Sequence, residues 1–130
     1  MKRSIAAALA TAALAFAGNG SAGEDMAQAM EFFERGHYVH ARDHLRAAAR
    51  NGDARAAEML GFMFGFGSAM FPGIGRDLEA SAHWFDMAAR GGRPAGRYMV
   101  CALRKQAGAP AARARRCFDW VAEMGVPGAR

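Results

Sequence analysis

Apolar residues recur every three or four positions in each long segment after residue 24, which is the spacing of an amphipathic helix. In the segment 26–36, Met26, Met30 and Phe33 share one face, and Gly36 ends the pattern. The apolar face of the segment 37–52 contains Tyr38, Ala41, Leu45, Ala48 and Ala49. No segment alternates with a period of two, so the pattern predicts helices without a sheet.

Residues that start and stop helices divide the rest of the chain. Asp53 and Asp77 are good N-caps for a third and a fourth helix. Pro94 and Pro110 can each serve as the first residue of a later helix, where the missing N–H costs little. We expect Gly125 to end the last helix. The predicted inner face of the fourth helix contains Leu78, Ser81, Trp84, Phe85, Ala88 and Ala89.

The helical segments repeat. Residues 44–60 align with 84–100 at an offset of forty, with Ala48-Ala49-Arg50, Gly52 and Met59 recurring, and "CFDWVAEMG" aligns with "WFDMAARGG" at an offset of 33. Small residues at the contact positions let helices approach closely, and helix pairs of this kind stack because one pair cannot bury its apolar face alone. We therefore predict an all-α fold, a short right-handed α-solenoid of antiparallel helix pairs with about five or six helices.

Two stretches of this pattern, "NGDARAAEMLGFMFGFG" and "IGRDLEASAHWFDMAARGG", resemble the Sel1-like repeat, an α-helical relative of the tetratricopeptide repeat. The resemblance implies repeats at approximately 37–75 and 76–108, with a partial third at 110–128. It also implies a scaffold for protein–protein interactions, since such repeats are commonly adaptors and not catalysts.

The chain departs from the usual repeat at several positions. The short Gly-x-Gly-Val turn is stretched into "GFGSAMFPGIGRD". His44 stands where the second copy has Trp84, Ser81 replaces an expected alanine, and Arg93 replaces the aspartate that follows the glycine. These departures leave the predicted fold unchanged but place any shared binding surface in question.

The first residues have the features of a secretory signal peptide. Lys2 and Arg3 precede the apolar run 5–17, and small residues follow. Cleavage after Ala17 or Ala22 would fit, and we favour Ala22, which gives a signal peptide of residues 1–22 and a repeat domain of residues 23–130. We therefore expect a periplasmic or secreted protein without a transmembrane segment in the mature chain.

The charge is uneven along the chain. Residues 23–89 contain six Arg and ten Asp or Glu, whereas residues 90–130 contain nine Arg or Lys and two acids. Such a basic half could meet an acidic protein, lipid head groups or cell-wall glycan, and Arg113, Arg115 and Arg116 are its candidate contacts. Solvated arginines on helix faces would give the same composition. We expect no nucleic-acid partner, because no recognisable binding motif is present.

Cys101 and Cys117 are the only cysteines and are sixteen residues apart on consecutive predicted helices. Outside the cytoplasm, two thiols usually oxidise where geometry allows. The sequence therefore favours a disulfide, and two small buried thiols on non-facing surfaces are the alternative.

Two clusters could bind metal, but solvated or groove-lining histidines and core-packed methionines explain them better. His37, His40 and His44 share a helix face, yet no acidic residue or cysteine is obviously placed to complete a zinc site. Met59 and Met63 could hold Cu(I), but they also lie on a core stripe. We therefore expect no metal and no cofactor.

The stretched turn is rich in bulky apolar residues, namely Phe66, Met70, Phe71 and Ile74. The turn either folds back over the helices as a plug or offers an apolar contact to a partner.

Nothing in the sequence indicates an enzyme. The serines lack a recognisable nucleophile elbow or a neighbouring general base, and no glycine-rich phosphate-binding loop is present. Acids such as Asp43, Glu58 and Asp86 resemble ordinary charges on helix surfaces. We expect a non-catalytic adaptor that binds an unidentified protein through residues near His40, His44 and Trp84 and through the loop 66–74. A binder of anionic envelope surfaces is the alternative. Self-association is also possible, because short solenoids often expose an end.

Overall fold

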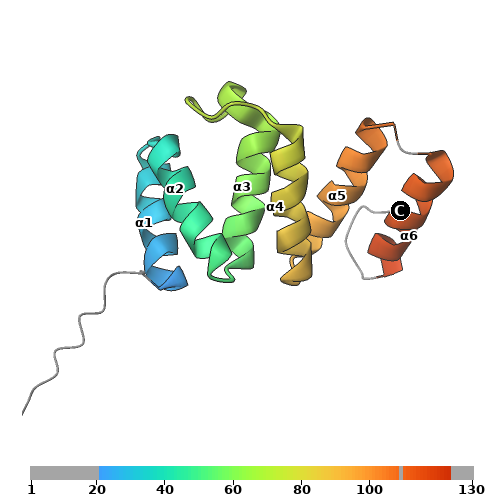
Figure 1. Ribbon diagram of the computed structural model, residues 1–130, viewed down its shortest axis with the longest axis horizontal. Coiled ribbons are helices and arrows are strands. Elements are labelled where there is room, and N and C mark those ends of the chain that lie inside the picture. The colour runs from blue at the N-terminus through green and yellow to red at the C-terminus, as the bar shows by residue number, and fades with distance from the viewer. Residues whose placement is uncertain (1–20, 109, 124–130) are drawn as a thin grey trace, which may run out of the picture.

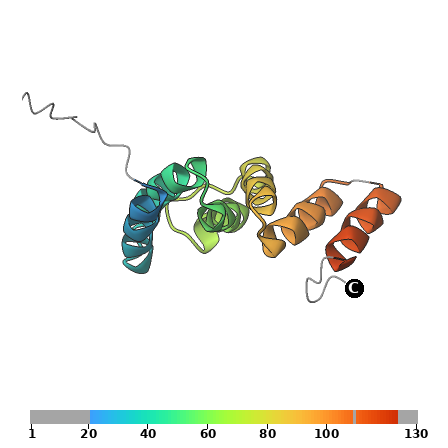
Figure 2. The same ribbon diagram turned by 90° about the horizontal axis from the view of Figure 1, so that it is seen from below.

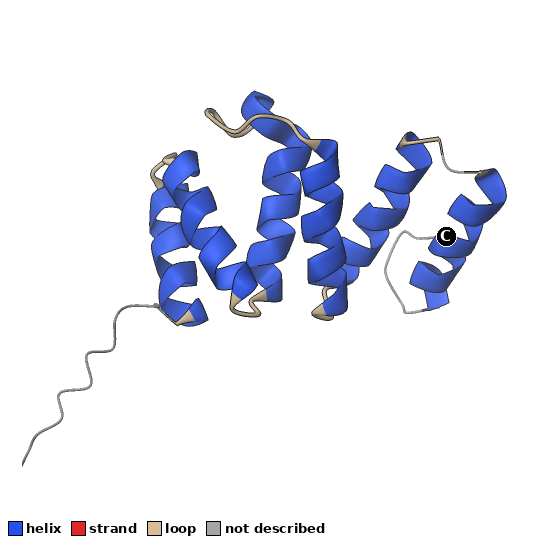
Figure 3. Cartoon of the chain, in the orientation of Figure 1, coloured by secondary structure: helices blue, strands red, loops and turns tan. Residues whose placement is uncertain are grey.

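The computed structural model describes residues 21–108 and 110–123, so most of the predicted signal peptide and the expected helix end at Gly125 lie outside the described residues. In that part the chain forms six α-helices, one short 3-10 helix and no strand (Figure 3). The elements are α1 (Ala22–Glu34), α2 (Tyr38–Arg50), α3 (Ala54–Phe66), η1 (Gly67–Ala69), α4 (Leu78–Arg90), α5 (Pro94–Gln106) and α6 (Ala111–Glu123).

The helices stand side by side in one elongated row, and each runs antiparallel to the next (Figures 1 and 2). Each helix packs mainly on its neighbours in sequence, which is how stacked helix pairs share one core. The helices α4 and α5 begin forty residues after α2 and α3, and α6 begins 33 residues after α4. Both spacings match the sequence repeats, and the predicted helical solenoid is confirmed.

The helices begin close to where the sequence predicts. The carboxylate of Asp53 accepts a hydrogen bond from the backbone N–H of Ala56 at 3.0 Å, and Asp77 does the same for Ala80 at 2.9 Å. Pro94 is the first residue of α5, as expected. The sixth helix starts at Ala111, so the prediction for Pro110 is wrong by one residue.

The close contact between α3 and α4 depends on small residues. An added Cβ at Gly61 of α3 would lie 2.7 Å from the Phe85 ring of α4, and one at Gly65 would lie 3.0 Å from the Ser81 hydroxyl. Ser81 is fully buried, and its hydroxyl donates a hydrogen bond to the Gly61 carbonyl at 2.7 Å. A serine therefore takes the place of the repeat's alanine without leaving a buried polar group unsatisfied.

Leu78 differs from its prediction. It was expected on the inner face of α4, but 40% of it is exposed. Leu78 lies in the first turn of α4, where it borders open hollows toward α5 instead of packing fully against α3.

Arg93, which departs from the repeat pattern, joins the two copies. Its guanidinium donates to the Glu58 carboxylate of α3 at 2.7 and 3.1 Å, and this hydrogen bond, followed by Coulomb attraction, raises the pKa of Arg93. Only 12% of the Glu58 side chain is exposed, so its expected role as an ordinary surface charge is wrong. Arg93 occupies the N-cap position of α5 without a side-chain cap bond, whereas the carboxylate of Asp53 caps α3 in the first copy.

A double-mutant cycle of Arg93→Gln and Glu58→Gln should give a coupling energy of about 1 kcal/mol, because a bidentate pair on a mostly buried carboxylate exceeds a typical surface ion pair. Chemical denaturation of the four proteins measures it. The exposed pair of Arg90 and Asp86, 2.9 Å apart within α4, is the control and should couple by about 0.5 kcal/mol or less. Equal couplings in the two cycles would show that Arg93 does not join the copies.

Candidate binding groove

The stretched turn after α3 divides into a buried and an exposed part. Ile74 is fully buried. The centroid of the Phe71 ring lies 5.3 Å from that of Tyr38 and 5.8 Å from that of Phe33. Phe66 and Met70 are 49% and 55% exposed. The turn therefore combines the two expected roles, a plug over the helices and an exposed apolar surface. Ile74 and Phe71 fold back over α1 and α2, while Phe66 and Met70 remain exposed.

Trp84 does not lie on an accessible surface, and its expected role in partner binding is wrong. Only 7% of it is exposed, and it belongs to the hydrophobic core. Its helix face carries Phe85 and Ala88 as well, so this face is the one that α4 buries. The sequence periodicity had already placed Trp84 on this inner face.

The histidines lie together over the ring of Phe32. The centroids of the His40 and His44 rings are 5.2 and 5.5 Å from that of Phe32, in stacked geometry. His44 Nδ1 also lies 3.4 Å from a carboxylate oxygen of Asp25. Phe32 and Asp25 both lie on α1, so the spacing of the histidines within α2 could not reveal these contacts. Across the described residues, no group of three or more histidines, cysteines and acids is placed to hold a metal ion.

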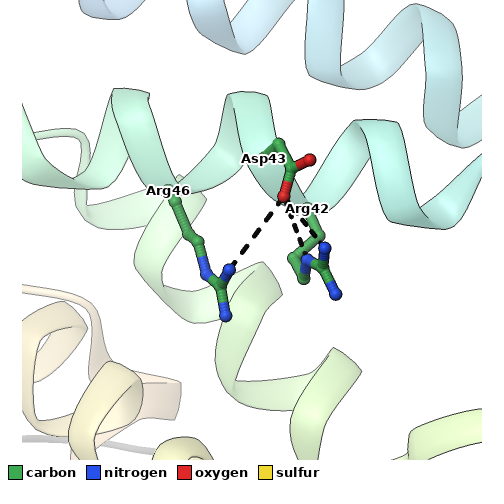
Figure 4. Close-up of polar contacts among 3 residues, drawn as sticks. All are labelled: Arg42, Asp43 and Arg46. Carbon is green, nitrogen blue, oxygen red and sulfur yellow. Dashed lines mark hydrogen bonds and ion pairs between the residues drawn. The ribbon is translucent and has the colours of Figure 1, made fainter. Parts of the chain in front are cut away.

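The charges on the outer surface of α2 pair with one another (Figure 4). Asp43 accepts two hydrogen bonds from Arg42 at 3.1 Å, and Arg46 lies 4.0 Å away. The Arg46 guanidinium also lies over the Phe64 ring, 5.4 Å from its centroid. Exposed pairs of this kind contribute about 0.2–1 kcal/mol each, and because two arginines share one carboxylate, one positive charge remains uncompensated.

Three adjoining hollows, which share lining residues, run across the other half of the molecule, and together we call them the α3–α6 groove. The apolar hollow, about 400 Å³, lies between α4 and α5 and includes Leu78, Val100 and Leu103. The aromatic hollow, about 320 Å³, shares Leu78 and Leu103 with it and extends to Phe62 and Phe66 of α3. The arginine hollow, about 380 Å³, shares Val100 with the apolar hollow and extends to α6.

The arginine hollow concentrates positive charge. Four guanidinium groups and one carboxylate, that of Asp86, line it; the arginines are Arg97, Arg104, Arg113 and Arg116. The sequence singled out the last two, while Arg115 on the same helix lines none of the three hollows. Arg97 and Arg104 were missed, although their separation of seven residues places them on one face of α5.

A disulfide between Cys101 and Cys117 forms one wall of the arginine hollow, with 5.7 Å between the Cα atoms. The Tyr98 and Phe118 rings, 5.6 Å apart, form a second contact between α5 and α6. These contacts hold α6, and with it Arg113 and Arg116, beside α5.

No family model and no curated protein matches the chain. Among solved structures, the crystal structure of a Sel1 repeat protein from Oxalobacter formigenes is similar, with 23% sequence identity, a TM-score of 0.66, and coverage of 83% of this chain and 84% of that chain. This chain has a Sel1-like repeat fold. The likeness spans most of the helical row, so the Sel1-like repeat expected from the sequence is confirmed as the fold.

Within the Sel1-like repeat fold, the accessible features of this chain are distributed unevenly. The histidines and the paired charges lie on α2, whereas the α3–α6 groove extends from the end of the first copy across the second copy to α6. None of the described helices has the length and the apolar composition that crossing a membrane requires.

Proposed function

We propose that this protein is a non-catalytic scaffold that binds another protein, and that the α3–α6 groove is its contact surface. One observation carries the proposal: exposed apolar side chains and a cluster of guanidinium groups line three adjoining hollows. Phe66 and Leu78, two of the large apolar residues that stay exposed, border it. Apolar surface next to charge in a concave site is typical of protein contacts.

A second candidate function is binding to an anionic envelope surface. The excess of basic residues after residue 89 supports it. Arg115 is exposed outside the groove and could contact such a surface. Against it, Arg113 and Arg116 line a depression, whereas a flat surface is met best by protruding charges.

We also propose that the protein is exported and acts in the periplasm or outside the cell, on the basis of the signal-like residues 1–22. The capping box at the start of α1 bears on the cleavage position: the Ser21 hydroxyl accepts from the Glu24 N–H at 3.3 Å, and the Glu24 carboxylate accepts from the Ser21 N–H at 3.2 Å. Cleavage after Ala22 would remove this cap, so we now favour cleavage after Ala17. The intact mass of the exported protein distinguishes the two products.

Fractionation of cells that make the tagged protein tests the function. We expect the protein in a soluble complex that elutes well above its own mass, and we expect Leu78→Gln combined with Arg116→Glu to shift it to the position of the free chain. The matched control is Met70→Gln combined with Arg115→Glu, which makes the same chemical changes outside the groove and should keep the complex. Recovery of the wild type in the membrane and wall fraction, with release by salt, would contradict the scaffold and favour surface binding.

A further inference from the structure

The α3–α6 groove changes chemical character along its length. Its α3 end contains the aromatic side chains of Phe62 and Phe66, its middle contains Leu78 and Leu103, and its α6 end contains the arginine hollow. The hollows share lining residues, so one extended ligand could contact all three.

We infer that the groove binds an acidic amphipathic segment of a partner protein, with bulky apolar side chains in the aromatic and apolar hollows and at least two carboxylates in the arginine hollow. This inference rests on the proposed function and names the chemistry of the partner.

The apolar part of the groove can anchor large side chains. Phe66 and Leu78 are among the large hydrophobic residues that the fold leaves exposed, so contact with a partner would remove their apolar surface from water. Phe62, Phe85 and Met99 also line the aromatic hollow. A leucine or phenylalanine of the partner would therefore meet apolar walls on several sides.

The charges fix which end of the groove receives the carboxylates. Asp86 is the acid of the arginine hollow, and Arg90 already lies 2.9 Å from it. Arg104, Arg113 and Arg116 have no side-chain partner within the described part of the chain. Glu79 lines the apolar hollow and would repel an acid there. The aromatic hollow contains one guanidinium against four in the arginine hollow, and that group, Arg76, donates to the Gly65 carbonyl at 3.2 Å. Carboxylates are thus favoured beside α6 and disfavoured beside the start of α4.

The shape of the groove favours a polypeptide over an anionic lipid. The hollows meet at Leu78 and Leu103 on one side and at Val100 and Arg104 on the other. Separate depressions of 320–400 Å³ suit successive side chains on one backbone, whereas an unbranched alkyl chain requires one continuous channel.

Selection from a library of random 12-residue peptides displayed on phage, with the exported protein as bait, tests the inference. We expect the enriched peptides to contain two or more large apolar residues followed or preceded by at least two Asp or Glu residues. Synthetic versions should lose at least tenfold in affinity with Arg116→Glu and with Leu78→Gln, and also when their acids are changed to Asn or Gln. Raising the salt concentration should weaken the acid-dependent part of binding.

The matched variants Arg115→Glu and Met70→Gln should retain affinity within about threefold, because their side chains line none of the three hollows. An equal loss of affinity with Arg115→Glu would overturn the inference, because it would show that binding depends on the overall charge and not on the arginine hollow. Enrichment of peptides without acids, or of no peptides, would overturn it as well. Vesicles of phosphatidylglycerol that bind the wild type but not Arg116→Glu, without any acidic peptide selected, would instead identify a lipid site.

The inference and the proposed function can fail separately. If the soluble complex depends on the groove but the selected peptides lack acids, the scaffold stands and the acidic partner is wrong. If no groove-dependent complex forms and no peptide is selected, both are wrong.

Discussion

Gly96→Ala is expected to lower the free energy of unfolding by about 2–3 kcal/mol, although alanine normally stabilises a helix relative to glycine. Gly96 lies within α5, where it is buried and adopts no left-handed conformation. A Cβ added there would lie 2.8 Å from the Phe85 carbonyl oxygen and 2.9 Å from the Ala89 nitrogen. Both atoms belong to the α4 backbone, so the two helices must separate to make room.

Chemical denaturation followed by circular dichroism measures this effect, and Gly23→Ala is its control. Gly23 lies in the first turn of α1, and an added Cβ would meet only the Ser21 hydroxyl at 3.8 Å. That variant should be neutral or slightly more stable than the wild type. If Gly96→Ala is as stable as the wild type, α4 and α5 do not approach as closely as described.

Replacing Cys101 and Cys117 together with alanine is expected to cost about 3 kcal/mol in the chain-entropy model for a loop of this length. Among the described helices, α6 packs mainly on α5. The loss should therefore be local: α6 should detach while α2, α3 and α4 stay folded. In hydrogen exchange, the amides of α6 should then exchange faster, and those of α3 should keep their wild-type rates.

A reducing agent provides the matched comparison for this variant. It should reproduce the faster exchange of α6 in the wild type and should change nothing in the double-alanine protein. Unchanged protection of α6 after reduction would mean that packing of Phe118 on Tyr98 holds the helix without the disulfide. The arginine hollow would in that case remain complete in a reducing environment.

Most of the fold could be predicted from the sequence because the signals are local and repeated. Asp53 and Asp77 cap helices through their own side chains, and Pro94 opens a helix through its fixed φ angle. The forty-residue offset then shows which helix of the second copy corresponds to each helix of the first. The exposure of Leu78 could not be predicted. Periodicity assigns a residue to one face of a helix, but it does not say whether a neighbouring helix covers that face at the helix end.

The candidate site was only partly predictable. Arg113 and Arg116 were identified from local charge, and Phe66 from its unusual turn. Periodicity places Trp84 on the inner face of α4, where an aromatic residue packs in the core and is not available as a contact. The groove itself depends on how α5 lies against both α4 and α6, and no pattern within one helix contains that information.

Photocrosslinking in cells tests most directly whether the α3–α6 groove is the binding surface. A photoreactive residue is placed at Phe66 or Arg113, which line the groove, and separately at His40 or Arg50, which lie on α2. We predict one recurring protein adduct from both groove positions and none from the α2 positions. Adducts from α2 alone, or only lipid or glycan adducts from Arg113, would contradict the proposed binding surface.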